Sequence, residues 1–290
     1  MVLRTRGLTK RFGGVSAVDG VDFELGEECC SLIGPNGAGK TTFFDLLTGV
    51  LSPSAGSVEY RGDDGYVDIT DRAPHGTAQA GIHRSYQITN LFATSTVLEN
   101  VRVAAQAHGD DSWRAWRNVD AFPEYEREAR RVLDRVGLAD EADAVAETLS
   151  HGEKRNLEVA VALAGDPDVL LLDEPTAGVS SDGIDELTGL VDDIADDHAV
   201  LLVEHNMEVV MEVSDRIAVL NQGSLIADDD PRAVRNDERV QDAYLGGYER
   251  EAGVSSGSGS NGGGSGSDGS SDGGSSGGSD GSGSGGGEPA

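Results

Sequence analysis

The fold of this chain is decided by the stretch Gly34-Pro35-Asn36-Gly37-Ala38-Gly39-Lys40-Thr41, which fills every fixed position of the phosphate-loop pattern. Its glycines let backbone N–H groups turn inward around phosphate oxygens, and Lys40 adds a positive charge beside the β- and γ-phosphates. The hydroxyl of Thr41 is suited to ligate Mg²⁺, and Thr42 is expected to bind the nucleotide beside it. The stretch therefore predicts a site for nucleotide phosphates.

The elements around this loop fit a parallel sheet covered by helices. The apolar run Glu28–Ile33 predicts a strand that ends at the loop. Lys40–Leu47 predicts a helix whose positive end would point at the bound anion. This alternation is typical of the α/β class. The other predicted elements are buried strands at Val169–Leu172, Ala199–Val203 and Ile217–Leu220, helices over Tyr125–Val136 and Ile184–Ile194, and a hairpin of Val58–Tyr60 with Tyr66–Ile69.

Two adjacent carboxylates, Asp173 and Glu174, follow the buried run Val169–Leu172. Ligands bind at the carboxyl ends of parallel strands, so these side chains are expected beside the phosphate loop. Asp173 is placed to hold Mg²⁺, directly or through water, and Glu174 could polarise an attacking water as a general base. An Asp-Glu pair is more often a solvated strand end, but the phosphate loop upstream favours the functional interpretation.

Acidic side chains dominate the charge of the chain. It has 52 Asp and Glu against 22 Lys and Arg, a net charge of −30, and its lysines are Lys10, Lys40 and Lys154. This excess repels nucleic-acid phosphates, so nucleic-acid binding through a basic surface is excluded. At molar salt the Debye length falls to about 3 Å, which screens the repulsion within the chain, so a salt-rich cytoplasm is the simplest setting. The acidic, lysine-poor composition resembles that of haloarchaeal proteins. The run Asp228–Asp230 is predicted to be a solvated turn.

Two further features bear on location and domain boundaries. No apolar run approaches the ~20 residues of a membrane-spanning helix, and no signal peptide is visible, so a cytoplasmic protein is expected. From about Gly253 the sequence is almost entirely Gly and Ser with a few acidic residues. Residues 251–290 are therefore expected to form a disordered tail, inert rather than partner-binding, and residues 1–250 to carry the fold.

A further motif identifies the kind of phosphate-loop protein. Leu149-Ser150-His151-Gly152-Glu153 resembles the signature of ATP-binding cassette (ABC) ATPases, which usually reads Leu-Ser-Gly-Gly-Gln. Other phosphate-loop ATPases, kinases and GTPases lack this motif, so it argues against them. His151 and Glu153 depart from the usual pattern. The resemblance implies that the Ser150 hydroxyl and the Gly152 N–H, at a helix start, would contact the γ-phosphate of ATP on a facing subunit.

Smaller landmarks of the ABC family also match. Gln87 fits the family's loop that senses Mg²⁺ and couples to the membrane subunit. His205 matches the histidine that contacts the γ-phosphate, and Phe12 matches the aromatic ring that stacks on adenine. Ser180 departs from the family pattern, which usually has Asp or Asn at this position of a loop that contacts the facing subunit. A lone histidine after a strand is usually a packed or surface residue, but the landmarks together, in order, favour the family.

The resemblance implies a RecA-like core, an antiparallel β subdomain near residues 1–30 and 56–70, and a helical subdomain at about 90–150. It implies ATP and Mg²⁺ as cofactors, with Thr41, Gln87 and Asp173 at the metal, and Glu174, His205 and Gln87 in catalysis. The implied partners are a second ABC ATPase subunit, either a copy or a sibling, transmembrane permease subunits and, indirectly, a solute-binding protein. The chain would then lie peripherally on the inner face of the cell membrane.

Within the family, the sequence resembles the branched-chain amino-acid (LivG-type) subunits over about residues 2–247. This likeness rests on Leu8–Gly14, Ala17–Asp19, the long segment between Gln87 and Ser150, and Val234–Gly246. The implied function is ATP hydrolysis that powers an importer for branched-chain or related amino acids. ABC ATPases for urea transport or lipid export share much of these features. A regulatory ABC ATPase outside transport is the other alternative, although one cassette and no sustained heptads argue against the translation and DNA-repair members.

Overall fold

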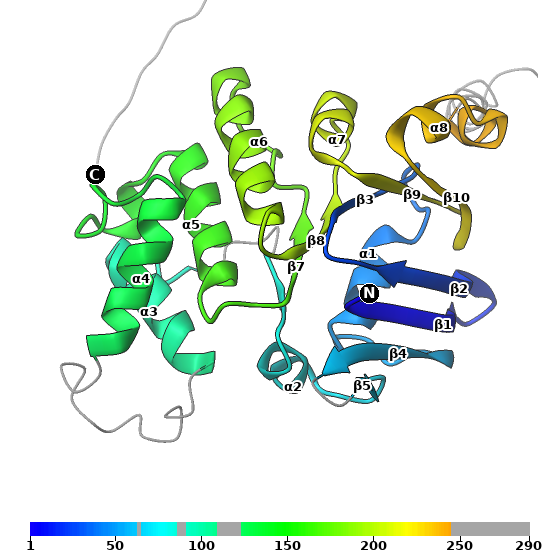
Figure 1. The fold of residues 1–290 in the computed structure, drawn as a ribbon, viewed down its shortest axis with the longest axis horizontal. Coiled ribbons are helices and arrows are strands. Elements are labelled where there is room, and N and C mark those ends of the chain that lie inside the picture. The colour runs from blue at the N-terminus through cyan, green and yellow to red at the C-terminus, as the bar shows by residue number, and fades with distance from the viewer. Residues whose placement is uncertain (63–64, 86–90, 109–122, 245–290) are drawn as a thin grey trace, which may run out of the picture. The chain divides into compact units, whose positions relative to one another are not determined.

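Two β-sheets organise residues 1–62, 65–85, 91–108 and 123–244, the part of the chain that the computed structural model describes (Figure 1). The strands are β1 (Leu3–Phe12), β2 (Val15–Leu25), β3 (Cys29–Ile33), β4 (Ala55–Gly62), β5 (Gly65–Asp68), β6 (Ile82–Arg84), β7 (Val169–Asp173), β8 (Ala199–Val203), β9 (Arg216–Asn221) and β10 (Ser224–Asp229). The smaller sheet has the order β2-β1-β4-β5 and is antiparallel. The larger has the order β10-β9-β3-β8-β7-β6 and is parallel except for β10 at its edge.

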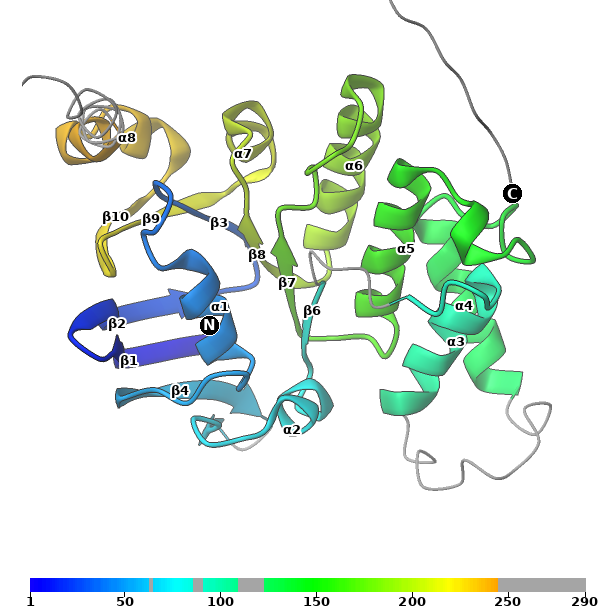
Figure 2. The same cartoon turned by 180° about the vertical axis from the view of Figure 1, so that it is seen from behind.

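Helices cover the larger sheet and form a separate group at one end of it (Figures 1 and 2). They are α1 (Lys40–Leu47), α2 (Pro74–Gln79), α3 (Val97–His108), α4 (Pro123–Arg135), α5 (His151–Leu163), α6 (Ser181–Ala195), α7 (Met207–Val213) and α8 (Pro231–Arg235), with a short 3-10 turn at Ala146–Thr148. All these described residues fall within one unit, Met1–Arg250. The predicted α/β class, the antiparallel hairpin and the three predicted helices are confirmed.

The central strands are apolar along their whole length because both of their faces are buried. Leu170 and Leu172 of β7 pack into a cluster with α3, α4, α5 and α6. Leu171, one position between them, packs into a second cluster with α1 and the antiparallel sheet. Successive strand residues point to opposite faces, so a strand between two cores needs a continuous apolar run rather than an alternating one. Every residue of β3, β7 and β8 is buried, as the sequence pattern predicts.

One prediction about the acidic residues is wrong. Asp228 and Asp229 do not form a turn but end β10, and Asp230 caps α8 by accepting hydrogen bonds from the backbone N–H groups of Arg232 and Ala233. The turn between β9 and β10 is at Gln222-Gly223, within the stretch Asn221–Gly223 that the sequence favours as a turn, and both residues have positive φ, 50° and 83°. Two such residues make a tight hairpin whose strands continue to pair, and this extends β10 to Asp229.

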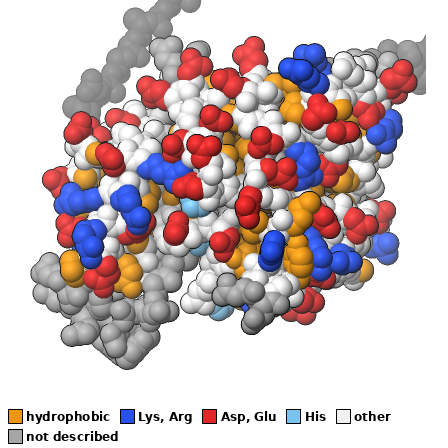
Figure 3. Space-filling model, in the orientation of Figure 1, with side chains coloured by type: hydrophobic (Ala, Val, Ile, Leu, Met, Phe, Trp, Pro, Cys, Tyr) orange, Lys and Arg blue, Asp and Glu red, His pale blue; other side chains and the backbone are white. Residues whose placement is uncertain are grey.

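On the face shown in Figure 3, acidic side chains are interspersed with basic ones rather than gathered in one patch. Among the described residues, no helix is long and apolar enough to span a membrane. Gln87 and the tail expected at residues 251–290 lie outside the described residues.

Candidate functional site

The phosphate loop connects the end of β3 to the start of α1, where the sequence pattern predicts it. Close backbone approach requires two of its glycines: a Cβ at Gly34 would lie 2.0 Å from the carbonyl oxygen of Leu220, and one at Gly39 would lie 2.2 Å from that of Ala17. Gly39 also has φ 108°, a conformation that other residues rarely adopt. The loop therefore packs closely against its neighbours, which fixes the backbone N–H groups that can bind an anion.

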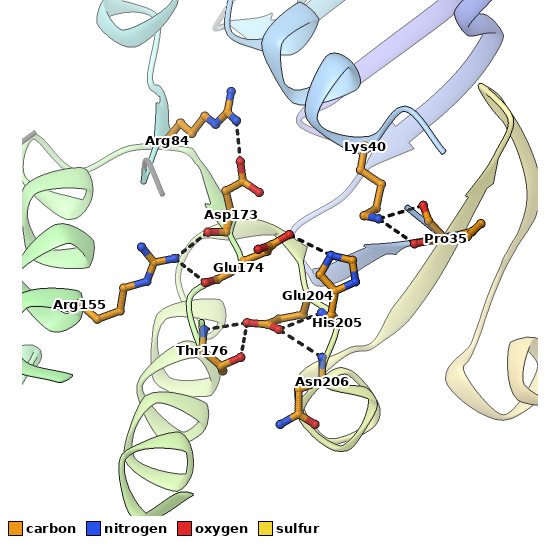
Figure 4. A network of polar contacts seen from close by, with 11 residues as sticks. Pro35, Lys40, Arg84, Arg155, Asp173, Glu174, Thr176, Glu204, His205 and Asn206 are labelled. Atoms are coloured by element: carbon orange, nitrogen blue, oxygen red, sulfur yellow. Dashed lines mark hydrogen bonds and ion pairs between the residues drawn. The ribbon is translucent and has the colours of Figure 1, made fainter. Parts of the chain in front are cut away.

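Lys40 lies at the first position of α1 and is 7% exposed. Its Nζ donates to the carbonyl oxygens of Gly34, at 2.7 Å, and Pro35, at 3.4 Å (Figure 4). Burial lowers the pKa of Lys40, while the charges of Glu174 and Asp173 oppose that shift. The two carboxylates predicted beside the phosphate loop thus act electrostatically on its lysine.

Asp173 is the last residue of β7 and is 6% exposed. Its Oδ2 accepts from Nη2 of Arg84 at 2.6 Å, and Nη1 of the same guanidinium donates to Asp45 of α1 at 2.7 Å. Burial alone would lower the pKa of Arg84, but the hydrogen bonds to Asp45 and Asp173 outweigh it and raise the pKa. Arg84 therefore joins three elements, the ends of β6 and β7 and the helix after the phosphate loop.

Glu174 follows in a left-handed conformation, with φ 49°. Such a backbone costs about 1–3 kcal/mol for a residue other than glycine and persists only where its surroundings enforce it. Its N–H donates to the carbonyl oxygen of Val203 at 2.8 Å, on the neighbouring strand β8. Its side chain turns towards His205, and Oε1 lies 2.9 Å from His205 Nε2 (Figure 4). The sequence predicts three catalytic residues, Glu174, His205 and Gln87. The structure describes the first two and brings them into contact.

Glu204, which the sequence analysis overlooked, organises the backbone on both sides of this pair. It is 3% exposed, and its Oε1 accepts from the N–H and the hydroxyl of Thr176 at 2.7 and 2.6 Å. Its Oε2 accepts from the N–H groups of His205 and Asn206 at 2.9 and 3.3 Å. Both oxygens of this buried side chain are therefore satisfied by hydrogen bonds. In the sequence, the feature that could have indicated this role is that Glu204, a charged residue, directly follows the apolar run of β8.

The signature stretch begins α5 as predicted. Ser150 is the N-cap: its hydroxyl accepts from the N–H of Glu153 at 3.3 Å, and Glu153 Oε2 accepts from the N–H of Ser150 at 2.7 Å. This reciprocal pair is a capping box, in which Glu and Gln serve equally, so the departure at Glu153 preserves the helix start. The hydrogen bonds with Ser150 lower the pKa of Glu153. Gly152 lies in the first turn of the same helix.

The structure does not bring every predicted residue to the phosphate loop. The helix α5, which Ser150 and Gly152 begin, lies on the opposite side of β7 from α1 in both views (Figures 1 and 2). Phe12 ends β1 in the antiparallel sheet, and it is 49% exposed, with Lys10 Nζ 5.3 Å from the ring centre. An exposed ring of this kind offers a face on which a base can stack. Gln87 lies outside the described residues, beyond Ser85, whose N–H donates to Leu171 of β7.

A nucleotide with Mg²⁺ fits the groups assembled here. Thr41 is exposed at the start of α1, and Thr42 is partly exposed beside it. Among the described residues, no cluster of three or more His, Cys, Asp or Glu side chains could hold a metal ion by itself. Mg²⁺ is ordinarily held by one or two protein oxygens together with phosphates and water. One hydroxyl at Thr41 and one carboxylate at Asp173 match that donor set.

Comparison with known proteins agrees with this geometry. The family model described as "ABC transporter" matches residues 18–177, and the one described as "Branched-chain amino acid ATP-binding cassette transporter" matches residues 224–250. The branched-chain amino acid transport ATP-binding protein BraF of Pseudomonas aeruginosa is 40% identical over 253 residues, 84% of this chain and 98% of the relative. The corresponding protein LivG of Escherichia coli is 38% identical over 255 residues, with the same coverage.

A more distant relative and a solved structure are also similar to this chain. The lipopolysaccharide export ATP-binding protein LptB of Haemophilus influenzae is 31% identical over 248 residues, 84% of this chain and 97% of the relative. The solved structure of the ADP conformation of MJ1267, an ATP-binding cassette of an ABC transporter, superposes with a TM-score of 0.75. It is 28% identical and covers 84% of this chain and 98% of that one.

Proposed function

This chain belongs to the ABC transporter ATP-binding family, and from that membership we propose that it hydrolyses ATP to power an importer of branched-chain amino acids. The single observation that carries the catalytic part is the contact of Glu174 with His205, 2.9 Å apart, beside the lysine of the phosphate loop. A carboxylate there can accept a proton from water while a histidine fixes its orientation. The loop N–H groups and Lys40 would stabilise charge on the phosphates.

The roles of the site residues follow from their positions. We assign Glu174 as general base, His205 as the group that orients it and contacts the γ-phosphate, and Gln87 as the third catalytic residue. The phosphate loop from Gly34 to Thr42 would hold the phosphates, and the exposed ring of Phe12 would stack on the adenine. Mg²⁺, when bound, neutralises charge between the β- and γ-phosphates. Thr41, Asp173 and Gln87 are the side chains that would hold it.

We propose a second ABC ATPase subunit, a copy or a sibling, as the partner that completes the site. Ser150 is exposed at the start of α5, on the other side of β7 from α1. The signature would therefore serve a nucleotide held by a facing subunit rather than the nucleotide of its own chain. ATP would then favour a closed dimer because it gains contacts there, and hydrolysis would remove them.

Two findings support the amino-acid solute. Relatives 38–40% identical, named for branched-chain amino-acid transport, match nearly their whole length. The match at residues 224–250 carries the same description. The lipopolysaccharide export relative is 31% identical and makes lipid export the alternative. An import function implies transmembrane permease subunits as partners and, indirectly, a solute-binding protein. It also implies a peripheral position on the inner face of the cell membrane.

We also propose that the fold ends near residue 250, that residues 251–290 form an acidic tail, and that the protein works in a salt-rich cytoplasm. The net charge of −30 with three lysines supports the last point, because molar salt screens such repulsion.

Transport by the membrane complex tests the proposed function. The complex would be isolated through a tag on this chain and placed in proteoliposomes with ATP on the side of this chain. We expect ATP-dependent uptake of labelled leucine in the presence of the binding protein, and no uptake with Glu174→Gln. ATP hydrolysis without leucine uptake, but with transport of urea or lipid, would assign another solute. Wild-type hydrolysis coupled to no transport would favour the regulatory alternative.

A further inference from the structure

Arg155 connects the helix that begins with the signature stretch to the end of the strand that carries the catalytic carboxylate. It lies in α5, five positions after the Ser150 cap, and is 7% exposed. Its Nη2 donates to the carbonyl oxygens of Asp173 and Glu174 at 2.6 and 2.5 Å (Figure 4). Its Nε donates to the carbonyl oxygen of Pro175 at 2.9 Å. One side chain therefore binds three successive carbonyl groups.

Only a guanidinium has the geometry for this arrangement. Its N–H groups lie in one plane and point in fixed, different directions, whereas a lysine ammonium is a single point charge. The remaining arm, Nη1, pairs with Glu158 Oε2 at 2.5 Å, one turn further along α5. The side chains of Arg155 and Glu158 are 8% and 9% exposed, so the charge is neutralised inside the protein. Burial of the Arg155–Glu158 pair costs the free energy of desolvating both charged groups.

The carbonyls that Arg155 binds are those that determine the direction of the Glu174 side chain. The peptide group before Glu174 is held at its oxygen by Arg155 and at its N–H by Val203. The peptide group after Glu174 is held at its oxygen by Arg155. With both planes fixed, the left-handed conformation at φ 49° is fixed as well, and the side chain leaves the backbone towards His205.

We propose that Arg155 is a positioning residue that couples the signature helix to the catalytic carboxylate of the same chain. The proposal rests on the proposed function, in which Ser150 and Gly152 contact ATP held by a second subunit. Glu174 acts on the ATP of its own phosphate loop, so Arg155 joins the two nucleotide sites of a dimer. Seating of α5 on the partner's nucleotide aligns Glu174, and each site then hydrolyses efficiently only when the other is filled.

Kinetics of the full chain test this coupling. The informative variant is the double substitution Arg155→Gln with Glu158→Gln, which removes the guanidinium without leaving a buried unpaired carboxylate. We expect kcat to fall about 10²-fold, the loss typical of a misplaced catalytic group, while KM and the Kd of a fluorescent ATP analogue stay within about threefold. The Hill coefficient for ATP should fall from above 1 in the wild type to 1.

Two further variants separate positioning from charge and from general destabilisation. Arg155→Lys keeps the charge beside Glu158 but not the fork, so it should show the same loss of kcat and cooperativity. Arg130→Gln removes an arginine from an exposed pair with Glu126 on α4 and should behave as the wild type.

The outcomes distinguish this inference from the function on which it rests. Wild-type kcat and cooperativity in the double variant, or full activity in Arg155→Lys, would overturn the role of Arg155. An equal loss of ATP affinity and kcat would overturn it too, because it would show a general structural defect. A folded wild type that binds ATP but never hydrolyses it, alone or in its membrane complex, would instead overturn the proposed function.

Discussion

The carboxylate of Glu204 binds Thr176 through one oxygen and the backbone of His205 through the other. The loop after β7 and the loop after β8 are therefore held by a single buried side chain (Figure 4). Because Glu174 and His205 lie on these two loops, their 2.9 Å contact depends on Glu204 as well as on the strands.

Substitution of Glu204 by Gln should weaken both the fold and catalysis. A carboxylate accepts at all four bonds, whereas an amide must present an NH₂ group to two of the donors. We expect a loss of about 2 kcal/mol in the free energy of unfolding, measured by urea denaturation, and a fall in kcat. Glu208→Gln, at an exposed position on α7, is the matched control. Unchanged stability in Glu204→Gln would contradict the bridging role.

Substitution of Glu174 by Gln should stop turnover and preserve ATP binding. The amide keeps the size of the side chain but cannot accept a proton from water, so kcat should fall about 10²-fold or more. The measurement is steady-state ATP hydrolysis beside equilibrium binding of ATP, in molar KCl, with light scattering to follow ATP-dependent dimers. Turnover near that of the wild type would show that another group is the base.

Removal of Arg84 should leave two carboxylates facing each other in a buried place. The side chain of Arg84 is 6% exposed, and those of Asp173 and Asp45 are 9% and 24% exposed. We expect Arg84→Gln to lower the free energy of unfolding by about 3 kcal/mol, because breaking a buried pair leaves an uncompensated charge. Adding Asp45→Asn should recover part of the loss. Strict additivity of the two substitutions would contradict a direct interaction.

The capping box of α5 should make stability depend on pH in the acidic range. The hydrogen bonds with Ser150 lower the folded-state pKa of Glu153. Its contribution is therefore fully present above the unfolded pKa, about 4.3, and is lost as pH falls through the lower folded value. Gln at this position keeps a capping box without titrating. The difference in Tm between the wild type and Glu153→Gln should shrink between pH 6 and pH 3, and a constant difference would contradict this.

Salt should stabilise the protein strongly. Between 0.1 and 1 M KCl the Debye length falls from about 10 to 3 Å, which screens the repulsion within a chain of net charge −30. We expect the free energy of unfolding to rise by a few kcal/mol, which corresponds to a rise of ~10 °C in Tm for a domain of this size. Sucrose at matched osmolality controls for effects other than screening. A Tm that is flat or falls with KCl would remove the support for a salt-rich cytoplasm.

The sequence was sufficient to predict the fold class and most of the candidate site. The phosphate loop is a local pattern whose glycines, Lys40 and Thr41 have meaning at fixed spacing. Continuous apolar runs revealed β7 and β8, and parallel strands place their carboxyl ends at one edge. Glu174 was therefore expected beside the phosphate loop, whereas its 2.9 Å contact with His205 is seen only in the structure. The acidic run Asp228–Asp230 was predicted wrongly because a two-residue hairpin extends β10 beyond what local polarity suggests.

The tertiary structure alone revealed the residues that hold this site in shape. Arg84 reaches Asp173 across 89 positions in the sequence, Glu204 reaches Thr176 across 28, and Arg155 reaches Asp173 across 18. No local pattern marks such pairs, because they depend on which strands are neighbours and on the left-handed backbone of Glu174. The sequence by itself determined which chemical groups are present and at which strand ends. Their orientation was decided by long-range hydrogen bonds, which form only once the sheet order is set and water is excluded from around them.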